Sequence, residues 1–240
     1  MHEAKYLKVA RIIQNRIKDG TYKTQTPLPD QEALAKELGV SRLTVKKALD
    51  GLERKGLVYK QSGLGTFVLG DIPIKESNDA AANGFFGLQE ELGRDHISSE
   101  VLHFTIDFPD ENIQKNLRIK NNEPVYNILR LRRYDKKPFI LEHTYMPVKL
   151  VPNLDYVILN DSIYEYLHKQ LKLKFSVAYR KIKAAKADQW DQEFLKAKKD
   201  DPILELEQII WLSNGQPIEY STSRNRFNER NYVVLETKSF

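Results

Sequence analysis

Apolar side chains recur every three or four residues in three stretches at the start of the chain, the spacing of one face of an amphipathic helix. The first stretch covers residues 6–18, and its stripe consists of Tyr6, Val9, Ala10, Ile13 and Ile17. The second begins at Asp30, a capping acid, and ends before Gly39. The third follows Ser41, which is also suited to cap a helix. We therefore predict three short helices, with a three-residue turn between the second and the third.

A glycine-punctuated segment follows the third helix. It runs from Val58 to Val68, with strand-forming residues at its ends and Gly63 and Gly65 in the middle. Glycine tolerates the positive φ angles of a tight turn and allows the backbone to approach a phosphate closely. Helix, turn, helix and hairpin in this order predict a winged helix-turn-helix, because the combination is much more specific than any of its pieces.

Beyond a polar, proline-containing segment the apolar pattern changes to β-branched and aromatic runs broken by turn signals. The predicted strands are residues 101–106, 126–133, 139–145, 203–212 and 232–235, with a further strand from Glu219 to Arg224. The predicted helices are residues 110–117, 161–171 and 188–196. Consecutive strands with short turns favour a mostly antiparallel sheet with helices packed on it. The expected fold class is α+β: a winged helix-turn-helix domain at 1–70, a linker at 71–84 and a second domain at 85–240.

The charge distribution separates the same two regions. The first 70 residues contain 13 of the 38 Lys and Arg but 7 of the 33 Asp and Glu, so the positive excess of the chain lies there. Such an asymmetry indicates a polyanionic partner at one end. Because there is no cysteine, disulfides, thiolate metal sites and a cysteine nucleophile are excluded. No apolar run is long enough to span a membrane, and we expect a cytoplasmic protein.

The third predicted helix has a basic outer face of the kind that enters a major groove. Arg42 can bond a guanine edge or a phosphate in bidentate fashion, and Lys46 lies one turn further on. Ser41 and Thr44 add short donors at the positive end of the helix, where phosphate is favoured. A basic helix face can also be no more than a solvated surface. The order of the surrounding elements favours DNA.

A series of short motifs runs through this basic region. They are Pro27-Leu28-Pro29, Leu34-Ala35, Leu38-Gly39-Val40-Ser41-Arg42, Thr44-Val45-Lys46, Ala48-Leu49 and Gly63-x-Gly65-Thr66-Phe67-Val68. With them, residues 5–70 resemble the DNA-binding domain of the GntR family of bacterial transcription regulators. The resemblance implies DNA contacts by Ser41, Arg42, Thr44, Lys46, Lys47, Ser62 and Gly63. Relatives often have arginine where this chain has Glu32; because an acid repels phosphate, either that contact is missing or the local register differs.

Two arginines lie two residues apart on one predicted strand of the second domain. Arg130 and Arg132 therefore project from the same sheet face and invite an anion. The next strand supplies Glu142. A three-residue loop after Asp135 would place Glu142 opposite Arg132, whereas a two-residue loop would place Leu141 there. The structural alternative is a simple cross-strand ion pair.

Other candidates are single polar residues beside turns. Ser162 lies at a predicted helix start, where it can help to hold phosphate or serve only as a cap. Glu219 follows the turn Gly215-Gln216-Pro217. The histidines show no metal-ligand spacing, and no serine has a nucleophile-elbow signature. We therefore expect no catalytic residue, no metal and no cofactor.

A second set of motifs links these candidates. It comprises Arg130-Leu131-Arg132, Pro138, Glu142, Tyr145-Met146-Pro147, Ser162-Ile163-Tyr164, Gly215-Gln216-Pro217-Ile218-Glu219 and Ser221. Residues 80–240 thereby resemble the UTRA effector domain of the HutC subfamily, which implies a chorismate-lyase-like α+β fold with a small-molecule pocket. The implied effector-binding residues are Phe85, Phe86, Arg130, Arg132, Glu142, Ser162, Tyr164 and Glu219. In members that sense sugar phosphates, the arginines and serine hold phosphate and the glutamates hold hydroxyls.

One departure concerns Gly84-Phe85-Phe86, where relatives frequently have Ser-Phe-Ser or Ser-Phe-Thr. The lost hydroxyls imply either fewer phosphate contacts or an aromatic-lined pocket of different selectivity.

These features together predict a homodimeric transcription regulator and not an enzyme. We expect a repressor of sugar uptake or catabolism genes that binds a palindromic double-stranded DNA operator and is released by a sugar phosphate. An organic acid is the alternative effector. Two other classes stay open from the sequence: a lyase-like enzyme, and a general nucleic-acid binder that uses the basic region alone.

Overall fold

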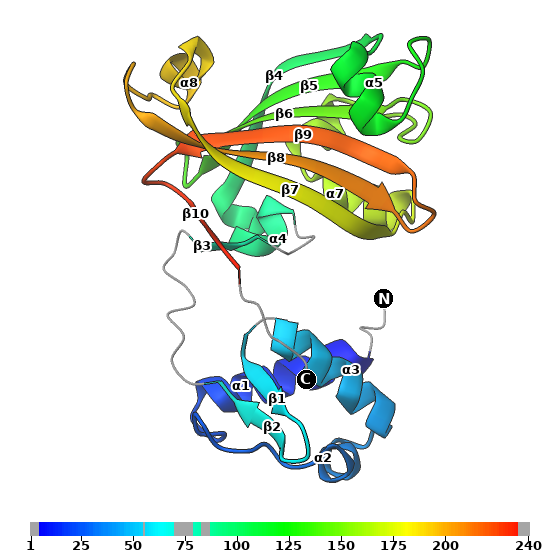
Figure 1. Cartoon of the computed structure of the whole chain (residues 1–240), viewed down its shortest axis with the longest axis vertical. Coiled ribbons are helices and arrows are strands. Elements are labelled where there is room, and N and C mark those ends of the chain that lie inside the picture. Colours follow the sequence, from blue (N-terminus) through cyan, green and yellow to red (C-terminus); the bar gives the residue numbers. More distant parts are fainter. Residues whose placement is uncertain (1–4, 55, 70–78, 83–86, 235–240) are drawn as a thin grey trace. The chain divides into compact units, whose positions relative to one another are not determined.

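The computed structural model describes residues 5–54, 56–69, 79–82 and 87–234, which divide into two compact units (Figure 1). One unit contains the described residues up to Asp79 together with Val233 and Val234, and the other is Ala80–Tyr232. None of the helices in these ranges is long and apolar enough to cross a membrane.

The N-terminal unit is a three-helix cluster with a hairpin. Its elements are α1 (Lys5–Lys18), α2 (Gln31–Leu38), α3 (Arg42–Arg54), β1 (Val58–Gln61) and β2 (Gly65–Val68). Asp30 caps α2 by accepting a hydrogen bond from the amide of Ala33, and Ser41 accepts one from the amide of Thr44. The core consists of the predicted apolar stripes, with Ile13, Leu34 and Leu52 fully buried. The helix-turn-helix pattern is confirmed.

The hairpin forms as the glycines predict. β1 and β2 pair antiparallel from Val58↔Val68 to Gln61↔Gly65, and the turn contains Gly63 at φ +74° and Gly65 at φ +116°. A side chain at either position would be strained by the backbone conformation alone. The hairpin therefore projects as a wing with an exposed tip.

The second unit is built on one six-stranded antiparallel sheet in the order β4-β5-β6-β9-β8-β7 (Figure 1). The strands are β4 (Ile97–Asp107), β5 (Val125–Tyr134), β6 (Lys137–Pro147), β7 (Phe175–Lys186), β8 (Pro202–Leu212) and β9 (Pro217–Arg226). A short pair, β3 (Asp79–Ala81) and β10 (Asn231–Val233), stands apart from it. The expected α+β class with an antiparallel sheet is confirmed.

Helices cover both faces of the sheet. They are α4 (Leu88–Leu92), α5 (Glu111–Leu117), α6 (Tyr156–Asn160), α7 (Ile163–Glu165) and α8 (Gln189–Phe194), with the 3₁₀ turn η1 (Arg94–His96) and the π-helical turn η2 (Tyr166–Gln170). The main core joins Ile128 and Met146 of the sheet to Leu159 and Leu167. On the opposite face, α5 and α8 make smaller clusters. Alternate residues of each strand therefore enter different cores.

Several parts of the second unit differ from the sequence prediction, which did not include the short helices α4 and α6. Strand β7 was not predicted, because its lysine-rich segment lacks the usual strand composition; it is the exposed edge strand, where lysines are common. The helix predicted at residues 161–171 is wrong in detail. Ser162, and not Asp161, caps it, and after α7 it continues as the π-helical turn η2.

The pairing of β5 with β6 also corrects the sequence analysis. The loop contains two residues, Asp135 and Lys136, both at positive φ, yet a bulge after Arg132 shifts the register. Glu142 lies directly opposite Arg130, and Arg132 lies opposite Ile140. Neither Glu142 nor Leu141 is the direct partner of Arg132, because the turn begins at Asp135 itself, one residue earlier than expected, and the bulge offsets this change only in part.

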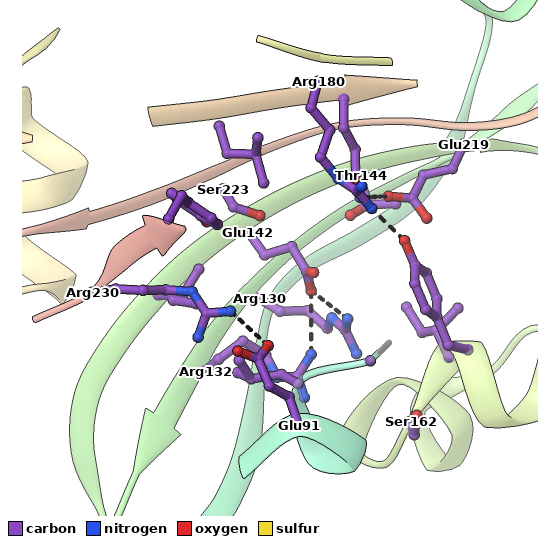
Figure 2. Close-up of a pocket in the computed structure, with 18 of the residues that line it drawn as sticks. Glu91, Arg130, Arg132, Glu142, Thr144, Ser162, Arg180, Glu219, Ser223 and Arg230 are labelled. Atoms are coloured by element: carbon purple, nitrogen blue, oxygen red, sulfur yellow. Dashed lines mark hydrogen bonds and ion pairs between the residues drawn. The ribbon is translucent and has the colours of Figure 1, made fainter. Parts of the chain in front are cut away.

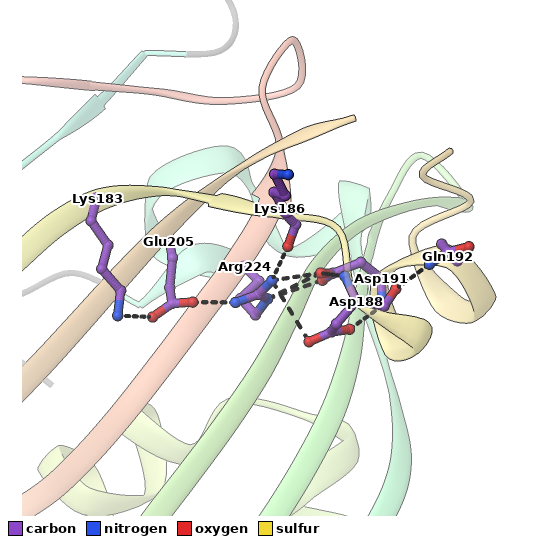
Figure 3. Close-up of polar contacts among 7 residues, drawn as sticks. All are labelled: Lys183, Lys186, Asp188, Asp191, Gln192, Glu205 and Arg224. Atoms are coloured by element: carbon purple, nitrogen blue, oxygen red, sulfur yellow. Dashed lines mark hydrogen bonds and ion pairs between the residues drawn. The ribbon is translucent and has the colours of Figure 1, made fainter. Parts of the chain in front are cut away.

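A row of charged side chains, with Asp191 and Glu205 buried in it, links α8 to the outer part of the sheet (Figure 3). Arg224 of β9 donates to both oxygens of Asp191, at 2.7–3.2 Å, and to Glu205 of β8. Lys183 of β7 contacts the other oxygen of Glu205 at 2.9 Å. Asp191 is fully buried and also completes the capping box of α8 with Asp188. Charges of alternating sign therefore connect three strands and one helix.

We expect the substitution Asp191→Asn to lower the free energy of unfolding by about 3 kcal/mol, because it removes the carboxylate that Arg224 bonds through both oxygens. Urea denaturation would measure this change. The control is Glu100→Gln, which breaks the exposed pair with Arg133 and should change stability by less than about 1 kcal/mol. Equal effects of the two substitutions would contradict a structural role for the row.

Candidate functional site

The basic face of α3 lies at the protein surface. Val45, Ala48 and Leu49 point into the core, whereas the side chain of Arg42 is 67% exposed and Lys46 is exposed one turn later. The alternation follows from helical periodicity. Two of the residues expected to contact DNA therefore stand free of the core on a capped helix.

The remaining predicted DNA contacts differ in their surroundings. The hydroxyl of Ser41, besides capping α3, lies 2.9 Å from that of Thr44. Ser62 and Gly63 are exposed at the wing tip. Lys47 lies over the ring of Tyr6 in α1, with its ammonium 4.3 Å from the ring centre. Lys47 is therefore engaged with α1, on a different side of α3 from Arg42 and Lys46.

Sequence reasoning missed part of this surface. A shallow hollow is lined by Gln31, Arg42, Leu43 and Lys46, which we call the reading surface. Leu43 is 74% exposed, an unusual position for a large apolar side chain. Glu32, at the start of α2, contacts Arg42, with 3.4 Å between carboxylate and guanidinium. The packing of α2 on α3, which creates this hollow, has no signal in either helix alone.

The second unit contains a pocket on the sheet face that carries the main core (Figure 2). We call it the sheet pocket. It is lined by Ala82, Gly87, Leu88, Glu91, Arg130, Arg132, Ile140, Glu142, Thr144, Met146, Ser162, Ile163, Tyr164, Arg180, Leu206, Gln208, Glu219, Ser223, Arg230 and Tyr232. Six of the eight predicted effector-binding residues are among them. The other two, Phe85 and Phe86, lie outside the described residues.

The centre of the sheet pocket is a pair of buried arginines that share one carboxylate (Figure 2). Arg130 and Arg132 are 3% and 5% exposed. Arg130 donates to Glu142 and, at 2.9 Å, to the carbonyl of Leu159, while Arg132 is 3.5 Å from the same Glu142 oxygen. Two cations and one anion leave a net positive charge in a desolvated place.

The pKa values of Arg132 and Glu142 are shifted by burial and by the excess of positive charge around them. Burial, followed by repulsion from Arg130, lowers the pKa of Arg132 to about 10, so it is still charged at neutral pH. Burial acts to raise the pKa of Glu142, but the two arginines outweigh it and hold that pKa below its usual value. Glu142 is therefore an anion, and the site as a whole favours a second one.

Several buried polar atoms in the sheet pocket have no hydrogen-bond partner among the described residues. They include Nε of Arg130, Nε of Arg132 and Oε2 of Glu219. Buried polar atoms are normally bonded. Two unsatisfied donors and one unsatisfied acceptor therefore belong to residues that line this pocket.

Glu219 belongs to a hydrogen-bonded group at the other side of the pocket. Its Oε1 accepts from Ser221 at 2.6 Å and from Gln208 at 2.8 Å, and Gln208 also donates to Tyr164. Burial raises the pKa of Glu219, although the Ser221 hydrogen bond opposes this. Burial, with the nearby Glu219, raises the pKa of Tyr164 as well. This side offers acceptors and hydroxyls suited to a polyhydroxylated group.

Ser162 has the structural role that the sequence analysis left open. Its hydroxyl oxygen accepts from the amide of Glu165 at 3.2 Å, which caps α7. The same residue lines the pocket, and its hydroxyl hydrogen is still available for donation. Capping and ligand contact are therefore compatible.

Two further arginines that line the pocket were not anticipated from the sequence. Arg180 lies on β7 and donates to Gln208 at 3.1 Å and to the carbonyl of Ala82 at 3.0 Å. Arg230 precedes β10 and contacts Glu91 of α4 at 2.7 Å. Among the described residues, no cluster of three or more His, Asp or Glu could hold a metal ion.

Comparisons with known proteins agree with both units. Residues 5–68 match the family model "Bacterial regulatory proteins, gntR family", and residues 92–229 match the UTRA domain. The chain is 40% identical to the HTH-type transcriptional regulator GmuR of Bacillus subtilis over 225 residues, covering 94% of this chain and 95% of GmuR. It is 30% identical to the mannosyl-D-glycerate transport/metabolism system repressor MngR of Escherichia coli, covering 99% and 98%.

The crystal structure of YydK from Bacillus subtilis superimposes with a TM-score of 0.81 at 25% identity, covering 98% of this chain and all of that one. The gntR family model and these relatives are described as transcriptional or regulatory proteins, so the expectation that the chain is not an enzyme is confirmed. The chain belongs to the gntR family of bacterial regulatory proteins, in the HutC subfamily with a UTRA effector domain, and is a DNA-binding transcription regulator.

Proposed function

We propose that this regulator is a cytoplasmic homodimeric repressor of sugar uptake or catabolism genes, released from its operator by a phosphorylated sugar. Residues 1–70 would bind the operator, residues 71–84 would link the domains, and residues 85–240 would bind the effector. The observation that supports the anionic effector is the pair of buried arginines with a single shared carboxylate.

A phosphate group suits this centre for electrostatic and geometric reasons. Guanidinium groups bond phosphate or carboxylate oxygens through paired, charge-assisted hydrogen bonds. Arg130 and Arg132 bring two such guanidinium groups to the lining of the pocket, and Ser162 adds a hydroxyl. A ligand anion would balance the extra positive charge and so would bind to the folded protein at a place prepared for it.

The sugar part is supported by the polar group around Glu219. Carboxylate, amide and phenol groups of Glu219, Gln208 and Tyr164 match ring hydroxyls. The name of the relative MngR, a repressor of a mannosyl-D-glycerate system, joins a sugar to an organic acid. A carboxylate in place of phosphate is therefore the second candidate for the anionic part of the effector.

The operator side is supported by the exposed face of α3 and the wing tip. We propose that Arg42 and Lys46 reach base edges or phosphates in the major groove, with Ser41 and Thr44 beside them. Ser62 and Gly63 would contact the backbone and minor groove, and Lys47 would act at the edge of the interface. One module of this size gives limited specificity, so two modules reading a palindrome are expected.

The link between the two sites is a difference in affinity. If the effector favours a domain arrangement whose two modules do not match the half-site spacing, it weakens operator binding, and operator DNA must weaken effector binding by the same factor. The direct test is a gel shift of promoter DNA at fixed salt, with glucose 6-phosphate, mannose 6-phosphate, a phosphorylated disaccharide and the unphosphorylated sugars as competitors. Release by none of the phosphorylated compounds would contradict the proposal.

Arg132→Met should remove the anion response without unfolding the protein. The substitution leaves Arg130 and Glu142 as a balanced pair, so thermal stability should stay equal or rise. Affinity for the active sugar phosphate should fall about tenfold to a hundredfold in calorimetry. Arg133→Ala, on the opposite sheet face, is the matched control. A destabilised Arg132→Met variant that still responds would show that Arg132 is a structural residue.

Effector binding should weaken on acidification. The loss of affinity should begin at a higher pH than it would if Glu219 had the pKa of an ordinary glutamate. The pKa of Glu219 is raised, so protonation removes an ionised acceptor while the solution is only mildly acidic. Calorimetric titrations between about pH 8 and about pH 5 would measure this. Since the phosphate of the ligand also changes charge in this range, the diagnostic is the difference from Glu219→Gln, which should show less pH dependence. Identical profiles would exclude Glu219 from the ligand site.

Light scattering should give a mass twice that of the 27.9 kDa chain, and titration of selected operator DNA should end at two chains per duplex. A monomer that binds its operator one to one would contradict the homodimer and the palindrome together.

A further inference from the structure

Glu32 is an acid within reach of the surface expected to read DNA. Its side chain is 79% exposed at the start of α2, and its carboxylate lies 3.4 Å from Nη1 of Arg42, which is 67% exposed. Gln31, the preceding residue, lines the reading surface with Arg42. A negative charge therefore stands where most neighbouring charges are positive.

The other described acids of this domain have partners elsewhere. Asp30 caps α2, Asp19 bonds Thr21, Glu37 bonds Arg16, and Asp50 and Glu53 bond Lys60. Glu32 is thus distinguished by its partner, because Arg42 is a residue that we propose to touch DNA. Exposed ion pairs contribute little to folding stability. The effect of this pair must then be sought in DNA binding.

A carboxylate at this place has two physical consequences. It repels every phosphate that approaches, whatever the sequence, and so lowers non-specific affinity. It also accepts from one edge of the Arg42 guanidinium, which limits the orientations of a long side chain and leaves its remaining donors for another acceptor. Both effects raise the ratio of specific to non-specific binding.

We propose that Glu32 is a specificity-determining residue, which holds Arg42 toward a guanine edge and reduces its attraction to phosphates. The proposal rests on the proposed role of α3 in reading DNA. A guanine O6 and N7 accept two parallel hydrogen bonds from an arginine that is already oriented. In this arrangement Glu32 is a positioning residue, and Arg42 makes the base contact.

The test begins with duplexes selected by the full-length wild-type protein from a random pool. Fluorescence anisotropy then gives Kd for the best duplex, for its single-base variants and for a random duplex, over a series of salt concentrations. The variants are Glu32→Gln, Arg42→Lys and, as matched control, Glu37→Gln, which removes the same charge from the other end of the same helix.

Glu32→Gln should bind the random duplex several-fold more tightly, with a steeper salt dependence by about one unit of slope. Its preference for guanine at one position of each half-site should fall about tenfold. Arg42→Lys should lose the preference at that same position while it retains binding to random DNA. Glu37→Gln should leave the guanine preference unchanged.

Two outcomes would overturn the proposal, and they differ in scope. If the wild type selects a sequence but Glu32→Gln keeps the same guanine preference, Glu32 does not position Arg42, and the reading role of α3 stands. If neither Arg42→Lys nor Glu32→Gln changes any base preference, the proposed role of α3 fails as well. Melting temperatures of all variants should equal that of the wild type, because the substituted side chains are exposed.

Discussion

The second domain is organised around an unbalanced group of charges in its interior. Arg130 and Arg132 are buried beside one carboxylate, and burial of an uncompensated cation is among the least favourable events in folding. The surrounding fold makes this arrangement tolerable by giving Arg130 the carbonyl of Leu159 and by keeping Glu142 ionised. The net positive charge that remains would favour the binding of an anion.

The two faces of the sheet carry separate groups of charged residues. Residues of one face form successive rows across the strands, such as Arg130, Glu142 and Ser223 in the pocket. One residue further along β9, Arg224 faces the other side and joins Glu205 and Lys183 in a row of alternating charges (Figure 3). The row of alternating charges therefore anchors α8 on one face, while on the other face the second cation, Arg132, lies beside the Arg130–Glu142 pair. The period of two along each strand produces this separation.

The DNA-binding domain shows a comparable use of charge on a much smaller scale. Its described acids cap helices or bond nearby side chains, and Glu32 takes one donor edge of Arg42. Because a cation beside a carboxylate is less attracted to phosphates, the acids on this surface also affect how strongly its arginines would bind DNA. In the proposed function, both domains would bind anions through arginines that already contact a carboxylate of the protein.

The sequence by itself determined the class of the protein and the order of the elements in its N-terminal domain. Helical periodicity, the caps Asp30 and Ser41 and the wing glycines are local signals, so they specified the N-terminal domain almost completely. The alternation of Arg130 and Arg132 placed both on one sheet face. Only the tertiary structure decided that Glu142 lies opposite Arg130, because a bulge shifts the pairing. It also showed that Arg180 and Arg230 line the pocket and that Glu32 contacts Arg42. Register and contacts between distant elements depend on packing in three dimensions, which no local pattern records.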